Sequence, residues 1–103
     1  MYSIETLEEV EDDLLLLPKE VLVEALAYFD KYKTNPFQYS QPLENKGGRD
    51  LRGCRKTYIA NATYRIILQV EKGVAKIVSI ICVGERNNMD AYNTAHARLN
   101  LQK

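Results

Sequence analysis

The spacing of hydrophobic residues changes near the middle of this chain, and that change constrains the fold more than any other feature. In the first third, Leu7, Val10, Leu14 and Leu17 recur at the three- and four-residue intervals of a helix. In the second half, apolar and polar residues alternate at every second position, as in strands with one buried face. Helices are therefore expected first and strands second.

Two helices are expected in the N-terminal third, with a proline between them. Pro18 ends the first helical stripe and suits the first turn of a second helix, because its fixed φ and missing N–H are tolerated there. Val21, Ala25 and Phe29 share one face of that second helix, which is expected to stop before Asn35. The pair predicts a helical hairpin laid on a flat partner.

Three strand-like runs follow a loop rich in proline, glycine and amide residues. Residues that favour tight turns separate the runs, and the third run, rich in Ile and Val, is expected to be the central strand. A short alternating segment near the N-terminus is a candidate edge strand, and the last amphipathic segment is expected to be a helix. The loop is residues 35–50, the strands are 55–59, 64–71 and 74–83 with turns at Asn61 and Lys72-Gly73, the edge strand is 2–5, and the last helix is 87–101.

Together these elements predict a single α+β domain over residues 1–103. The N-terminal helical hairpin is expected to pack on a small, mostly antiparallel sheet of three or four strands. The helices are expected on one side of the sheet, and a short C-terminal helix closes the fold.

The composition excludes several other classes of protein. Hydrophobic residues make up 46% of the chain and charged residues 27%, unlike a disordered tail or a collagen-like repeat. The longest nearly apolar run, residues 77–84, is too short for a membrane span, and no signal peptide is visible. Cys54 and Cys82 have no metal-binding or redox spacing. A cytoplasmic protein with two reduced thiols is expected.

The two halves of the chain carry opposite charge, although the formal net charge is zero. Residues 1–50 contain 5 Lys/Arg and 11 Asp/Glu, whereas residues 51–103 contain 9 Lys/Arg and 3 Asp/Glu. Such asymmetry points to a polyanionic partner for the basic half, or it reflects where solvated surface happens to fall.

No residue pattern in the sequence indicates a metal or a cofactor. His96 has no second ligand at a useful spacing, and the acidic residues from Glu5 to Asp13 fit a solvated helix face. Cys54 and Cys82 lack a histidine partner for nucleophilic catalysis, and small buried residues are the favoured interpretation.

Three arginines are the strongest candidates for chemistry. Arg55, Arg65 and Arg86 lie in or just after three different expected strands. Arg65 is expected to point away from the apolar side of its strand, and Arg55 shares a face with Thr57. If the strands are neighbours, three guanidiniums converge on the open face of the sheet, where they would hold a phosphate. Ordinary surface charge on a half-solvated sheet is the alternative.

Several short motifs, taken in order and at their spacing, resemble the RelE/ParE superfamily of toxins from type II toxin–antitoxin systems. The order of the expected elements fits that family as well. The matching pieces are Leu51-Arg52-Gly53 before Arg55-Lys56, then Tyr64-Arg65-Ile66-Ile67, then Val83-Gly84-Glu85-Arg86, then Tyr92, and the ending from Ala95 to Leu99.

The resemblance to the RelE branch implies a small endoribonuclease that cuts mRNA in the ribosomal A site without a metal or cofactor and is held inactive by an antitoxin. In that chemistry a ribose 2′-OH attacks the adjacent phosphate and the 5′-oxygen leaves. The resemblance implies that Arg65 and Arg86 stabilise the phosphate and that Tyr92 lies at the 2′-OH or stacks on a base. It gives Arg55 the place of a basic residue in the first long strand. The residues expected to contact RNA are Arg52, Lys56 and Thr57.

One departure from the family leaves other functions open. Such toxins often place a second basic residue where this chain has Thr57, and Lys56 is expected on the opposite face from Arg55. The general base or acid could then come from the preceding loop. The alternatives are a ParE-like inhibitor of DNA gyrase without nuclease activity, or a catalytically degenerate homologue that only binds its antitoxin; Tyr92 after Val83 to Arg86 favours the ribonuclease. The loop candidates for the acid–base group are Lys46, Arg49 and Arg52.

Overall fold

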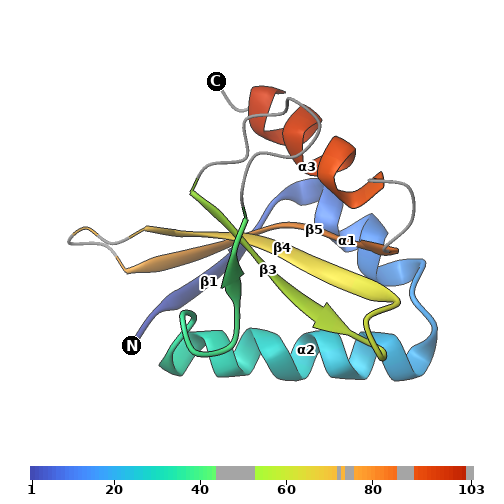
Figure 1. The fold of residues 1–103 in the computed structure, drawn as a ribbon, viewed down its shortest axis with the longest axis horizontal. Coiled ribbons are helices and arrows are strands. Elements are labelled where there is room, and N and C mark those ends of the chain that lie inside the picture. Colours follow the sequence, from blue (N-terminus) through green and yellow to red (C-terminus); the bar gives the residue numbers. More distant parts are fainter. Residues whose placement is uncertain (44–52, 72, 74–75, 86–89, 102–103) are drawn as a thin grey trace.

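The computed structural model describes residues 1–43, 53–71, 73, 76–85 and 90–101. Within residues 90–101 it describes the side chains of residues 93–100. Within these ranges it contains a hairpin of two helices, a sheet and a C-terminal helix (Figure 1). The elements are β1 (Ser3–Thr6), α1 (Glu8–Leu15), α2 (Lys19–Thr34), β2 (Gln41–Pro42), β3 (Cys54–Ile59), β4 (Tyr64–Glu71), β5 (Ile77–Glu85) and α3 (Asp90–Leu101).

The sheet has five strands in the order β1-β5-β4-β3-β2, with β1 parallel to β5 and the other neighbours antiparallel. The predicted α+β class and mostly antiparallel sheet are confirmed. The expected count of three or four strands falls short of the five observed, because the two-residue strand β2 arises in a loop sequence that has no period. The expectation that the Ile- and Val-rich strand is central is wrong, since β4 holds that place.

Helices cover both faces of the sheet, so the expectation that they lie on one side is wrong. The hairpin packs on one face, with α2 running beneath the strands, and α3 lies on the other face (Figure 1). The first core joins Val10, Phe29 and Tyr32 of the hairpin to the sheet. The second core sets Ala95 of α3 against Ile67 on the opposite face.

A bulge in β5 changes which of its apolar side chains face each helical layer. Ile67 pairs with Cys82 and Leu68 pairs with Ile80, so Ile81 is an extra residue on β5. Ile81 and Cys82 consequently both face α3, while Ile80 faces the hairpin. A strand that is apolar on both faces must be covered on both faces.

The β3–β4 turn fixes which side chains of the two strands share a face. Ala60, Asn61 and Ala62 all have positive φ angles, of 52°, 55° and 66°. Glu24 of α2 accepts a hydrogen bond from the Ala60 N–H at 3.0 Å, which holds this strained turn against the hairpin. The turn predicted at Asn61 is confirmed. Because a slip of one residue would exchange the two faces, this turn sets the geometry of the site below.

Candidate active site

Three side chains on β3 and β4 gather on the face that α3 covers. The register pairs Tyr58 with Arg65 and Lys56 with Ile67, and cross-strand partners lie on the same face. Ile67 belongs to the core between α3 and the sheet, so all these side chains lie on the face that α3 covers. Lys56, Tyr58 and Arg65 are called the cationic cluster below.

The cationic cluster places one phenol between two positive charges. The Lys56 ammonium donates a hydrogen bond to the Tyr58 hydroxyl oxygen at 2.7 Å and lies 4.8 Å from the centre of its ring. The Arg65 guanidinium carbon lies 5.5 Å from the same ring centre. Arg65 is only 5% exposed, so its charge acts where solvent screens it little. The arrangement suits an anionic ligand and a proton transfer.

Arg55 lies on the other face of the sheet and has a structural position there. Its Nε donates to the Ser40 hydroxyl at 2.6 Å, and its Nη2 donates to the Ser40 carbonyl at 2.9 Å and the Phe37 carbonyl at 3.4 Å. The predicted convergence of Arg55 with Arg65 is wrong, because neighbouring positions on β3 alternate between faces. Lys56 takes the face of Arg65 instead, as expected from its position opposite Arg55.

We expect Arg55→Ala to lower the free energy of unfolding by about 1–2 kcal/mol, since three hydrogen bonds that tie the 36–40 segment to β3 are lost. Thermal or urea unfolding of the purified chain measures this loss. If the folded variant cleaves mRNA more than about tenfold more slowly than the parent, Arg55 takes part in the reaction after all.

Thr57 is buried between α2 and the sheet. It is 7% exposed, accepts a hydrogen bond from the Tyr32 hydroxyl at 2.5 Å and donates one to the Tyr39 carbonyl at 2.6 Å. Burial raises the pKa of Tyr32, although the bond to Thr57 opposes this. The expected contact between Thr57 and RNA does not fit this geometry.

Tyr58 is the member of the cluster that sequence reasoning missed. It is uncharged, and the resemblance to the RelE branch assigned the contact with RNA to the neighbouring Thr57. The signal was nevertheless present: once the turn is placed at Asn61, strand alternation sets Tyr58 opposite Arg65.

Five candidate site residues fall partly or wholly outside the described part of the chain. Lys46, Arg49, Arg52 and Arg86 lie outside it, and Tyr92 is described only as backbone in the first turn of α3. The register of β5 sets Gly84, two residues before Arg86 in the sequence, opposite Arg65. The roles assigned to Arg52, Arg86 and Tyr92 remain predictions.

Both cysteines are small buried residues, as predicted. The side chains of Cys54 and Cys82 are 2% and 3% exposed. Burial, and then the negative charge of Asp13, raises the pKa of the Cys82 thiol to about 12. The thiol is therefore protonated near neutral pH and is no nucleophile. Among the described residues, no three His, Cys, Asp or Glu side chains are grouped to hold a metal.

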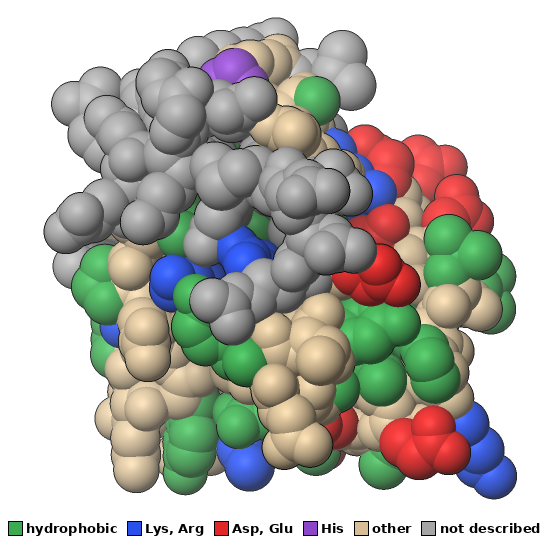
Figure 2. Space-filling model, turned by 45° about the vertical axis from the view of Figure 1, so that its right-hand side comes forward, with side chains coloured by type: hydrophobic (Ala, Val, Ile, Leu, Met, Phe, Trp, Pro, Cys, Tyr) green, Lys and Arg blue, Asp and Glu red, His purple; other side chains and the backbone are tan. Residues whose placement is uncertain are grey.

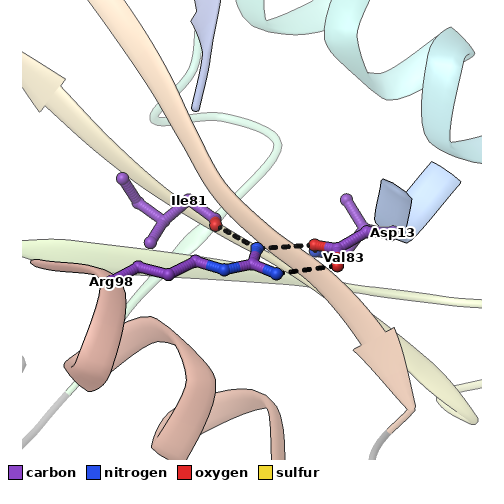
Figure 3. Close-up of polar contacts among 4 residues, drawn as sticks. All are labelled: Asp13, Ile81, Val83 and Arg98. Carbon is purple, nitrogen blue, oxygen red and sulfur yellow. Dashed lines mark hydrogen bonds and ion pairs between the residues drawn. The ribbon is translucent and has the colours of Figure 1, made fainter. Parts of the chain in front are cut away.

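An ion pair fastens α3 to the sheet beside this site (Figure 3). Arg98 donates to the two carboxylate oxygens of Asp13 at 2.7 and 2.9 Å and to the Ile81 carbonyl at 2.8 Å. The Val83 N–H donates to the same Asp13 at 3.1 Å. Because β1 pairs with β5 only as far as Ile80, these side chains satisfy the backbone groups that follow.

A cleft of about 310 Å³ lies next to this ion pair, and it does not suit a phosphate. Its lining includes Leu16, Gly84, Glu85 and the Asp13–Arg98 pair. Arg98 is already neutralised by Asp13, and Glu85 adds negative charge. Figure 2 shows Lys and Arg side chains near the centre of this view and acidic side chains gathered to their right.

No protein-family model matches the sequence, and no curated protein matches it significantly. Solved structures do match the fold. A mutant of the Escherichia coli toxin RelE in the free state superposes with a TM-score of 0.74 at 20% identity, covering 95% of this chain and 97% of that one. The chain has the RelE fold. The RelBE2 toxin–antitoxin complex of Mycobacterium tuberculosis gives 0.69 at 22% identity, covering 82% and 98%.

The RelE fold is shared by more than one kind of toxin. The YoeB/ParE toxin from Agrobacterium tumefaciens matches with a TM-score of 0.67 at 17% identity, covering 84% of this chain and 99% of that one. The architecture implied by the sequence motifs is thereby confirmed. Function has to be argued from the site, because one fold hosts several activities. No helix in the described ranges is long and apolar enough to cross a membrane.

Proposed function

We propose that this chain is the toxin of a type II toxin–antitoxin system and a single RelE-like domain that acts in the cytoplasm. Its activity is that of a metal-independent endoribonuclease that cleaves mRNA on the ribosome. The observation that carries the proposal is the cationic cluster, in which Arg65 and Lys56 flank a phenol on a RelE fold.

The chemistry of RNA cleavage asks for the groups that this cluster holds. Attack of a 2′-OH on the adjacent phosphate places extra negative charge on the phosphoryl oxygens, and fixed cations stabilise that charge. The Arg65 guanidinium, buried on β4, offers a planar fork that matches two phosphate oxygens. Arg86 and Tyr92 are the further residues that the resemblance assigns to the same reaction.

A cognate antitoxin is the second partner in this proposal. The M. tuberculosis relative was solved as a toxin–antitoxin complex, and an archaeal RelE from Pyrococcus horikoshii was solved with RelB. An antitoxin would silence this site by covering the cationic cluster or by moving α3. In the second case it has to break the bond between Arg98 and Asp13.

Induction of the chain alone in a bacterium is expected to stop growth and to produce cleaved transcripts. Primer extension on abundant mRNAs maps the cuts, and co-expression of the antitoxin restores growth. Growth arrest with intact transcripts and a DNA-damage response would support the gyrase-inhibitor alternative instead. Normal growth with a stable chain would support a degenerate homologue.

A further inference from the structure

Tyr58 is the residue of the cationic cluster that can both accept and donate a hydrogen bond near neutral pH. A guanidinium does not lose its proton in proteins, and a charged ammonium has donors but no lone pair. The Lys56 ammonium donates to the Tyr58 oxygen at 2.7 Å. A phenol that accepts on its oxygen keeps its own hydrogen as a donor.

RNA cleavage by a 2′-OH needs a proton donor. The P–O5′ bond breaks onto an alkoxide, which is a poor leaving group until it is protonated. Resting on the ribonuclease function proposed above, we propose that Tyr58 is the general acid of the reaction. As the 2′-O–P bond forms, the 2′-hydroxyl proton passes to water. The Tyr58 hydroxyl proton passes to the departing 5′-oxygen as the P–O5′ bond breaks, giving a 2′,3′-cyclic phosphate, a 5′-hydroxyl and a phenolate that water reprotonates.

The two cations of the cluster stabilise the phenolate that this step leaves behind. Lys56 holds the phenol oxygen directly, and the Arg65 guanidinium lies over the ring at 5.5 Å from its centre. Positive charge at these positions favours an anion over the neutral phenol. Tyr58 and Arg65 are paired across β3 and β4, so the phenol and the guanidinium lie on the same face of the sheet.

A role for the Tyr58 ring as a stacking platform fits the structure less well. Lys56 and Arg65 already lie over that ring within the range of cation–π contacts. A nucleobase stacked on Tyr58 would have to displace at least one of them. The hydroxyl, which Lys56 orients, is therefore the group we assign to the reaction.

Tyr58→Phe separates these roles, because it removes the hydroxyl and keeps the ring with its two cations. Single-turnover cleavage of an mRNA on a programmed ribosome should fall by about 10²-fold. In a second substrate, sulfur replaces the bridging 5′-oxygen of the same mRNA. Its leaving group departs as a thiolate and needs no proton. On this substrate Tyr58→Phe should cleave within about threefold of the parent chain.

The matched control is Tyr64→Phe, since Tyr64 lies on β4 and packs against the first core on the opposite face. It should cleave both substrates like the parent. Tyr58→His, which keeps a proton donor, should recover part of the lost activity and serves as the second variant if Tyr58→Phe does not fold. Parental cleavage by Tyr58→Phe would overturn the assignment, and so would a loss that sulfur does not relieve. A parent chain that cleaves neither substrate would instead refute the proposed ribonuclease function.

Discussion

Replacing Arg65 with alanine should lower single-turnover mRNA cleavage by about 10²–10³-fold, the usual cost of losing one preorganised donor to developing charge. Arg65 is 5% exposed on the central strand, and it shares a face with Lys56 and Tyr58. Arg65→Lys keeps the charge but loses the planar fork, so its cleavage should fall between those of the parent and the alanine variant. Binding to the ribosome should change much less, because attraction to RNA is spread over many basic residues.

The control for this experiment removes one positive charge from elsewhere. Lys76 is exposed just before β5 and lies 6.0 Å from the Tyr2 ring, away from the cationic cluster. Lys76→Ala should cleave like the parent at moderate salt. Because alanine leaves a gap at the buried Arg65 site, thermal unfolding is measured in parallel and rates are referred to folded protein. If Arg65→Ala and Lys76→Ala cleave alike, the cationic cluster is not the active site.

Local patterns in the sequence predicted most of the elements, because each pattern reflects the packing of its own segment. The Leu7 to Leu17 stripe and Pro18 predicted α1 and the start of α2, and alternation predicted β3 and β4 with a turn at Asn61. The faces of the sheet were harder to predict. The expectation that Arg55 shares a face with Arg65 errs by one residue, since Lys56 lies on that face, and in a strand such an error changes the face.

Features that depend on distant residues could not be read from local patterns. The bulge at Ile81 changes which side chains of β5 face α3, and no local period marks it. β2 exists because Pro42 and Gln41 meet β3 in space. Arg98 and Asp13 are separated by 85 positions, and the local pattern around Asp13 fits a solvated helix face.

The second large effect concerns that ion pair, and Arg98→Ala should lower the free energy of unfolding by about 2–4 kcal/mol. Removing one partner of a buried pair leaves the other charge uncompensated, which costs about 3–5 kcal/mol when the pair is fully buried. Here the two side chains are 13% and 15% exposed, so the expected loss is slightly smaller. For a domain of this size the melting temperature should fall by roughly 10–20 °C. Urea unfolding and calorimetry measure both quantities.

The exposed pair between Lys33 and Asp30 is the matched control. Its atoms are 3.3 Å apart, but the side chains are 47% and 79% exposed. Lys33→Ala should change the free energy of unfolding by less than about 1 kcal/mol, as exposed ion pairs usually do. Equal losses for Lys33→Ala and Arg98→Ala would show that the Asp13–Arg98 pair does not fasten α3.

Exchanging the two charges tests whether attraction between the side chains is the whole effect. A simple ion pair would survive Asp13→Arg combined with Arg98→Asp. In this structure each member also bonds a backbone group of β5: Asp13 accepts from the Val83 N–H, and Arg98 donates to the Ile81 carbonyl. The exchange would set a guanidinium against an N–H and a carboxylate against a carbonyl. We therefore expect the double variant to be at least as unstable as Arg98→Ala, whereas recovery of parental stability would show that the backbone contacts contribute little. Because α3 carries Tyr92 in its first turn, the same variants should also lose cleavage activity at temperatures where they remain folded.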